Sequence, residues 1–355
     1  MEKTPKIDLP AFKQPWEKNT NSIWLASTLC LHRNINKFHF PNRLDVEKRR
    51  LVANLILGAL RGSSALAGLI TYSGEDLSPL DRDLLAEHFL VFEPMKDSQH
   101  GHYYGIEDTG SLLIQVNAKD HLELHTVEVA DDLEKALSRL VAVERDVEKK
   151  LPFSFSQQFG YLTSDPFQCG TALQVCAYLH IPALVFRGIL AQSFEKESQE
   201  GLSFTSLQGN PEDLIGDLLV IRNRYTIGVT EEVILSAIRN TVLRIIMEEK
   251  AFRLKMQEDK DDRAIDRVSR AIGILQHSFT IDTGESLRAL SLLKFGIELG
   301  WIKGMGVEEV NEIFFDCRRA HLAKAQGREL YGSPQLNKTR AQMFRERAAS
   351  IELTA

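Results

Sequence analysis

The sequence predicts an α+β domain followed by an all-helical domain. Two apolar runs, Ser111–Asn117 and His121–Val127, flank a three-residue turn and are typical of a β-hairpin. From residue 264 onward the apolar residues recur with helical periodicity. The expected organisation is an N-terminal arm over residues 1–20, a mixed domain over 21–250, a linker helix over 251–262 and a helical domain over 263–355.

Helices are expected on either side of this hairpin. Before it, Asp45–Leu69 and Pro79–Phe92 carry apolar residues at helical spacing, and the first has a Gly-Ser break at Gly62–Ser64. After it, Asp131–Lys150 combines a long helical period with a charged face.

The segment Phe159–Leu184 predicts a strand, a loop and a helix. The strand is Gly160–Thr163, the loop closes at Gly170, and the helix ends before Pro182. This order commonly presents backbone N–H groups to an anion. However, residues 164–181 contain no Lys or Arg, so a phosphate site here would lack a cation.

The following segments alternate between loop, strand and helix signals. Phe194–Asn210 is rich in Gly, Ser, Gln and Glu and predicts a flexible loop, whereas Asp217–Arg224 is apolar enough for a strand. Thr230 is expected to cap a helix that continues to about Lys260. The helices expected in the C-terminal domain are 264–276, 283–299, 307–323 and 338–349.

Composition excludes several functional classes. The 355 residues are 43% hydrophobic and 26% charged, as in ordinary globular proteins, and the net charge of −6 gives no reason to expect nucleic-acid binding. No apolar run reaches membrane length and residues 1–19 lack a signal-peptide core, so we expect a cytoplasmic protein with no membrane partner. The four cysteines form no CxxC pair and are expected to be reduced, buried thiols: Cys30, Cys169, Cys176 and Cys317.

One set of side chains raises the question of a metal ion. His121, Glu123 and His125 alternate along a predicted strand and would share one face. We favour structural roles for both histidines and expect no metal site. Cys169 and Cys176, predicted to lie on a loop and helix, are expected to be core thiols and not a redox pair.

Residues 26–41, ASTLCLHRNINKFHFP, are the first of four matches to one family. They resemble the motif SSRIRLARNL, followed by FP, of the ATP:guanido phosphotransferases, and bacterial protein-arginine kinases give the closest fit. Ser27 is kept, whereas Thr28 and Cys30 stand where the family has phosphate-binding arginines. Neither replacement can form the bidentate contact of a guanidinium with phosphate.

Residues 117–123, NAKDHLE, resemble the family's NEEDHLR hairpin. Ala118 and Lys119 replace the glutamates that position the substrate guanidinium, and Glu123 replaces a phosphate-binding arginine. A lysine repels a guanidinium, and an acid facing ATP repels the triphosphate.

The two remaining nucleotide motifs are altered in the same way. Phe159–Leu184 resembles GYLTSCPTNVGTGLRASV, with Asp165 in place of the cysteine and Gln174 in place of the arginine that reaches ATP. Residues 205–212 align with the loop RGxYGEGSE, where Thr205 replaces the arginine. His88 matches a histidine that contacts the nucleotide in the family.

The resemblance covers residues 22–349 and implies a phosphagen-kinase-like antiparallel sheet flanked by helices, with a C-terminal helical domain specific to the bacterial kinases. It also implies ATP with Mg²⁺ and the phosphorylation of protein arginines. Because the substituted residues are those that touch phosphate or guanidinium, we interpret the chain as a pseudokinase that acts as a scaffold. The alternative is an active kinase with relocated cations: Lys119, Arg187, Arg222 and Arg224.

The C-terminal domain carries a partial match to a phosphoarginine pocket, marked RDxxRA in the family. Arg340 and Ala341 are kept, whereas Asn337 replaces the aspartate. A phosphoarginine-binding or partner-binding module is therefore a further alternative. The resemblance also implies a homodimer and protein partners, namely a zinc-finger activator and the Clp chaperone–protease machinery.

Overall fold

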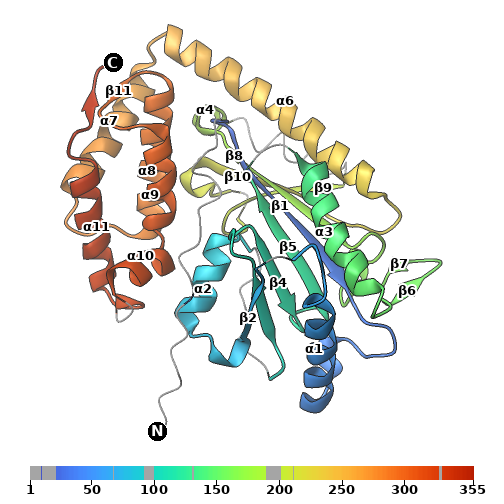
Figure 1. The fold of residues 1–355 in the computed structure, drawn as a ribbon. Helices are drawn as coiled ribbons and strands as arrows, with labels where there is room; N and C mark the ends of the chain where they lie inside the picture. Colours follow the sequence, from blue (N-terminus) through green and yellow to red (C-terminus); the bar gives the residue numbers. More distant parts are fainter. Residues whose placement is uncertain are drawn as a thin grey trace. The chain divides into compact units, whose positions relative to one another are not determined.

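The structure is a computed structural model that describes residues 9, 21–66, 68–91, 100–129, 132–188, 201–210, 212–327 and 330–355. The predicted N-terminal arm, residues 1–20, lies outside them except for Leu9. The chain forms two compact units (Figure 1). Most of the first unit is Ala26–Cys176 with Arg222–Arg239, and most of the second is Ala177–Ile221 with Asn240–Ala355.

An eight-stranded sheet has the order β2-β3-β4-β5-β1-β8-β10-β9. Its strands are β1 (Trp24–Arg33), β2 (Ile70–Ser73), β3 (Tyr103–Ile106), β4 (Leu112–Val116), β5 (Leu122–Glu128), β8 (Leu173–His180), β9 (Leu202–Ser206) and β10 (Leu218–Asn223). The run from β2 to β5 is an antiparallel meander, and β1 pairs antiparallel with β5. The predicted hairpin is therefore confirmed as β4–β5, and Asn117 begins its turn with a φ of 57° that asparagine tolerates.

Helices α1 (Val46–Leu60), α2 (Pro79–His88) and α3 (Leu133–Glu148) belong to the first unit. Each begins at an Asp or Ser whose side chain accepts a hydrogen bond from the first turn. Helix α1 ends at Leu60 and not at Leu69, because the Gly-Ser break leads into turns. Helix α3 packs on β5 and α1 packs on α3 (Figure 1).

The prediction of a helix before Pro182 is wrong, because Leu173–His180 is strand β8. Seven of its eight residues are buried, and β1 and β10 flank it in the sheet. A strand buried on both faces has a continuous apolar run that periodicity cannot distinguish from a helix. Cys176 therefore lies on a strand, and Cys169 follows the short 3₁₀ helix Pro166–Gln168.

The predicted loop Phe194–Asn210 is also partly a strand, because Leu202–Ser206 forms β9 at the edge of the sheet. Residues 194–200 of that prediction lie outside the described residues. Other short strands among the described residues also pair antiparallel: β6 (Phe155–Ser156) and β7 (Gly160–Tyr161) form a hairpin, whereas β11 (Ile302–Lys303) pairs with β12 (Glu352–Leu353), which lies distant in sequence.

The second unit contains the C-terminal helices. They are α7 (Asp262–His277), α8 (Thr283–Glu298), α9 (Val307–Asp316), α10 (Arg319–Gln326) and α11 (Gln335–Arg347), and the same unit contains the short helix α4 (Pro182–Arg187) from earlier in the chain. Helices α7, α8, α9 and α11 pack around one apolar core (Figure 1). The single helix predicted over 307–323 is two helices, because Cys317 and Arg318 form a break between α9 and α10.

Helix α6 (Glu231–Glu258) confirms the long helix predicted after Thr230. Residues 251–258 are its last turns, and Asp261 then caps α7 by accepting from Arg263 N and Ala264 N. Among the described helices, none is both long enough and apolar enough to span a membrane.

Candidate functional site

The candidate site lies on one face of the β1–β5 pair. Thr28, Cys30 and His32 alternate along β1, so their side chains share a face. In the antiparallel register His125 is directly opposite Cys30, and Glu123 is directly opposite His32. Polar and ionisable side chains thus form a compact patch on two neighbouring buried strands.

Glu123 is held by the turn of its own hairpin. Its Oε1 accepts hydrogen bonds from the backbone N–H groups of Lys119 (2.9 Å) and Asp120 (3.1 Å). The turn from Asn117 to His121 is itself closed by a bond from Asn117 N to His121 O of 3.0 Å. Main-chain N–H groups of the turn therefore position this carboxylate.

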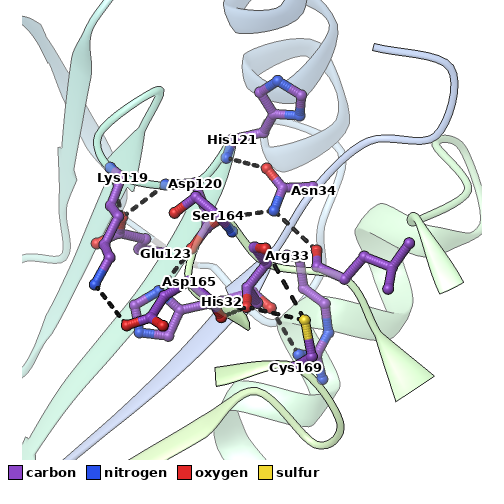
Figure 2. A network of polar contacts seen from close by, with 12 residues as sticks. His32, Arg33, Asn34, Lys119, Asp120, His121, Glu123, Ser164, Asp165 and Cys169 are labelled. Atoms are coloured by element: carbon purple, nitrogen blue, oxygen red, sulfur yellow. Dashed lines mark hydrogen bonds and ion pairs between the residues drawn. The ribbon is translucent and has the colours of Figure 1, made fainter. Parts of the chain in front are cut away.

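Asp120 lies at the centre of the polar network in Figure 2. Its Oδ1 accepts from Asn34 Nδ2 at 2.6 Å and from Ser164 N at 2.7 Å, and its Oδ2 forms an ion pair with His32 Nδ1 at 3.3 Å. Asn34 also accepts from His121 N at 3.0 Å. These contacts join β1, the hairpin turn and the segment after β7.

Two of the predicted catalytic positions meet at this site. Lys119 Nζ lies 3.6 Å from Asp165 Oδ2 as a half-exposed ion pair. Asp165 Oδ1 also accepts from Phe167 N at 3.1 Å and caps the short 3₁₀ helix. Ala118, beside Lys119 in the turn, presents only a methyl group. The arrangement contains no carboxylate at positions 118 and 119 for attracting a guanidinium.

Cys30 and His32 form a charge-coupled pair. Burial alone would raise the pKa of the Cys30 thiol, but the charge of His32 and hydrogen bonds with His125 and His32 lower it below its usual value. Burial would lower the pKa of His32, but Cys30, Asp120 and Glu123 together hold it well above 6.5. Each of these two groups therefore favours the charged form of the other.

The two nearby carboxyl groups respond in opposite directions. Burial raises the pKa of Glu123, and the charge of Asp120 adds to this effect while His32 opposes it. For Asp120, the hydrogen bond and charge of His32 overcome the effect of burial and lower the pKa. His32 is thus the cation around which the acidic groups of this site are arranged.

The sequence did not predict the cluster that the register creates. Ligand-type atoms of Cys30, His32 and Glu123 lie within 4.8 Å of one another. His121, which we had considered with Glu123 and His125, is engaged at both ring nitrogens, because Nδ1 accepts from Ile35 N (3.0 Å) and Nε2 contacts His39 O (2.9 Å). The structural role predicted for His121 is therefore the one its contacts support.

Arg33, which follows His32 on β1, has a structural role. Arg33 is buried on the opposite face of β1, donates to Glu144, to His32 O and to Thr171 O, and stacks 3.6 Å over the ring of Tyr161. These contacts commit the guanidinium to the core of the first unit.

The other predicted nucleotide-site residues lie on α2, β1, β8 and β9. His88 is buried on α2, and its Nε2 lies 2.8 Å from Gly110 O. Ser27 is buried on β1, Gln174 lies near the start of β8, and Thr205 is buried on β9 in the second unit. Cys176 on β8 hydrogen-bonds Thr28 and is influenced by the charge of Arg222, and burial raises its pKa to about 11.

The partial phosphoarginine pocket is closed around its own arginine. Arg340 is 1% exposed and donates to Cys317 O (2.6 Å), Ile281 O (2.9 Å) and Asn337 Oδ1 (2.7 Å). Ala341 is buried beside it. The guanidinium therefore links α9, α11 and the start of α8, and this arrangement does not present it to a ligand.

Comparison with known proteins agrees with this fold. Residues 53–252 match the ATP:guanido phosphotransferase C-terminal catalytic domain, and residues 261–354 match the protein-arginine kinase McsB C-terminal domain. Solved structures with the same phosphagen-kinase-like fold include lombricine kinase (TM-score 0.57, 20% identity, 71% of this chain and 74% of that one). The duplicated taurocyamine kinase of Schistosoma mansoni is similar over 83% of this chain and 49% of its own (TM-score 0.58, 17% identity).

Relatives in sequence are more similar over most of the chain. The protein-arginine kinase of Chlamydia muridarum is 33% identical over 88% of this chain and 86% of its own length. That of Halothermothrix orenii is 31% identical over 87% of this chain and 88% of its own, and that of Chlamydia pneumoniae is 30% identical over 88% and 87%. The chain belongs to the protein-arginine kinase family of the ATP:guanido phosphotransferases.

Proposed function

We propose that this member of the family does not transfer phosphate to arginine and instead acts as a scaffold or regulator. The observation that carries the proposal is the carboxylate of Glu123, which two backbone N–H groups fix on the site face directly opposite His32. The family resemblance expects a phosphate-binding arginine at this position. An acid in its place inverts the charge that phosphoryl transfer requires.

The described residues do not fit a Mg²⁺–triphosphate group. Asp120, Glu123 and Cys30 supply acidic groups around His32, which is the cation of the cluster. An anionic group placed about 4 Å from a phosphate oxygen opposes binding by about 1–4 kcal/mol, depending on solvent exposure. We therefore derive no phosphoryl-transfer step for this site.

The proposed scaffold role rests on the intact core of the C-terminal unit. The C-terminal unit keeps a complete apolar core, and Arg340 strengthens it by joining three segments. A folded family member without catalytic activity can still bind partner proteins through its surface. We propose a cytoplasmic role in Clp-linked protein quality control, as a homodimer and with a zinc-finger activator as partner.

A second candidate is a kinase that uses relocated cations, and one contact favours it. Burial raises the pKa of Cys176, Arg222 lies close enough for its charge to oppose that rise, and Cys176 hydrogen-bonds Thr28 on the site face. Two of the other cations of this candidate have contacts that do not involve the site face. Lys119 pairs with Asp165, and Arg187 lies 5.7 Å from the ring centroid of Phe252.

The experiment that separates these candidates measures phosphoarginine directly. The full-length chain is incubated with Mg²⁺–ATP and a protein substrate, and phosphoarginine is detected by mass spectrometry beside a catalytically active protein-arginine kinase. We expect no phosphoarginine above the enzyme-free blank. A thermal-shift titration with Mg²⁺–ATP is expected to be flat.

Arg222→Gln provides the control for the second candidate. ATP-dependent phosphoarginine that disappears in Arg222→Gln would establish the relocated-cation kinase and overturn the scaffold proposal. Activity that survives in Arg222→Gln but is lost in His88→Ala would also overturn it, and would place the nucleotide near α2.

A further inference from the structure

We infer that Cys30, His32 and Glu123, with His125 as a fourth ligand, form a binding site for a thiophilic divalent cation such as Zn²⁺. The proposal goes beyond the scaffold role, and it holds whether or not the chain transfers phosphate. It concerns the face of β1 and β5 on which the family resemblance expects phosphate-binding arginines at positions 30 and 123.

The antiparallel register places the four side chains together. Cys30 and His32 are two residues apart on β1, and their direct partners on β5 are His125 and Glu123. Ligand-type atoms of Cys30, His32 and Glu123 already lie within 4.8 Å of one another. Zinc bonds of about 2.3 Å to sulfur and about 2.0–2.1 Å to nitrogen place tetrahedral ligand atoms about 3.3–3.6 Å apart. A movement of about 1 Å per side chain would bring Cys30, His32 and Glu123 to these separations.

His125 is prepared for such a role by its second ring nitrogen. Its Nε2 lies 2.8 Å from Phe89 O, and a carbonyl can only accept, so Nε2 carries the proton in this contact. In the neutral ring the lone pair is then on Nδ1, and the side chain hydrogen-bonds Cys30. Metal-binding histidines commonly donate their other N–H to a carbonyl in this way.

His32 has the second partner expected of a histidine ligand. The carboxylate of Asp120 lies 3.3 Å from its Nδ1, and Asn34 and Ser164 N fix that carboxylate in turn. Carboxylate–histidine pairs of this type orient ligand rings and tune metal affinity.

The charge and softness of the ligands select the cation. A thiolate at Cys30 and a carboxylate at Glu123 together balance a divalent ion, so a neutral complex can form although both side chains are more than nine-tenths buried. Sulfur and imidazole ligands suit Zn²⁺, whereas Mg²⁺ prefers an all-oxygen octahedron. Within the described chain, His121 cannot join the set because backbone groups occupy both of its nitrogens.

The test uses Co²⁺ as a spectroscopic substitute for Zn²⁺ on the full-length, chelator-treated protein. We expect one equivalent of Co²⁺ to give a thiolate-to-metal charge-transfer band and the intense visible bands of a tetrahedral site. Addition of Zn²⁺ should remove these bands by displacement. Cys30→Ser should abolish the charge-transfer band, and Glu123→Gln and His125→Gln should weaken Zn²⁺ binding by at least about tenfold in calorimetry.

Cys176→Ser is the matched control, because it removes another buried thiol on the neighbouring strand β8. It should retain the band and the affinity. The proposal is overturned if the wild-type chain gives no charge-transfer band, or if Cys176→Ser loses the band and Cys30→Ser keeps it. Circular dichroism and urea unfolding establish that each variant is folded, and the wild-type spectrum decides the matter if Cys30→Ser is not. None of these readouts depends on kinase activity, so this test and the phosphoarginine assay can fail separately.

Discussion

Arg33 donates from Nε to Glu144 Oε1 across 2.6 Å, and both side chains are buried in the first unit. The pair connects β1 to α3, the helix that packs on β5. Because Arg33 also donates to two backbone carbonyls and stacks on Tyr161, the interaction is a fully satisfied ion pair inside the protein.

Arg33→Met is expected to destabilise the protein by about 3–5 kcal/mol, because it leaves the carboxylate of Glu144 buried without its cation. Urea unfolding followed by circular dichroism measures the change. The double variant Arg33→Met with Glu144→Gln should recover a substantial part of the loss. If the double variant is as unstable as the sum of both single variants, the pair is not coupled as described.

His121 is expected to make the protein sensitive to acid. Burial lowers its pKa from 6.5 to about 4, and its Nδ1 must remain unprotonated to accept from Ile35 N. The unfolded chain therefore binds the proton first, so this contribution, present in full above pH 6.5, is lost as pH falls toward 4. It amounts to about 3 kcal/mol.

The measurement is urea unfolding between pH 7 and pH 4 for the wild type and His121→Gln. The variant should lose less stability over this interval, although it is less stable at pH 7. His100→Gln changes an exposed histidine and should follow the wild-type curve. Parallel curves for the wild type and His121→Gln would contradict the prediction.

Lys294 is expected to act at the other end of the pH scale. It is buried on α8 with Asn311 Oδ1 3.3 Å from its Nζ, and burial lowers its pKa from 10.5 to about 8, although Glu298 opposes the shift. The folded protein releases this proton before the unfolded chain does. Stability from this group therefore rises between pH 8 and 10.5.

Lys294→Met should remove that rise, which amounts to about 3 kcal/mol over the full interval. The difference in urea midpoint between variant and wild type, measured at pH 7.5 and at pH 10, isolates it from other titrating groups. Lys303→Met alters an exposed lysine and should leave the pH dependence intact. A constant difference between Lys294→Met and the wild type would refute the assignment.

Gly170 is expected to tolerate no side chain. Its φ is +107°, and a Cβ would lie 2.3 Å from Thr226 O, while its own N and O pair with Tyr161. Gly170→Ala should cost about 3 kcal/mol or more in thermal or urea unfolding, because main-chain groups must move. Gly228→Ala, also at positive φ but with open space around its Cβ, should cost only about 1 kcal/mol. Equal losses would contradict the close approach.

Local signals predicted the elements that local chemistry controls. The β4–β5 hairpin follows from alternation and a short turn, and the caps of α1 and α7 are aspartates just before their helices. Strand β8 could not be predicted in this way, because its burial depends on β1 and β10, which are distant in sequence. The site face could be predicted only in part. The alternation of Thr28, Cys30 and His32 places these side chains on one face of a strand, but it does not identify the strand that lies beside it.

The register in which β1 pairs with β5 could not be predicted from the sequence. The match of Cys30 with His125 joins residues 95 positions apart, and a shift of one residue would place Cys30 beside the opposite face of β5. The family resemblance drew attention to Cys30 and Glu123, but the importance of His32, Asp120 and His125 depends on contacts that no motif describes.

The β1–β5 pair has a consequence for how such proteins diverge. Its ladder is made by main-chain groups, so the backbone hydrogen bonds are indifferent to which side chains project from the face. The family resemblance implies arginines at positions 30 and 123, and the exchange of such arginines for thiol and acidic side chains would leave every backbone hydrogen bond of the ladder in place. In this architecture the backbone structure of the sheet and the chemistry of the side chains on its face can therefore change independently.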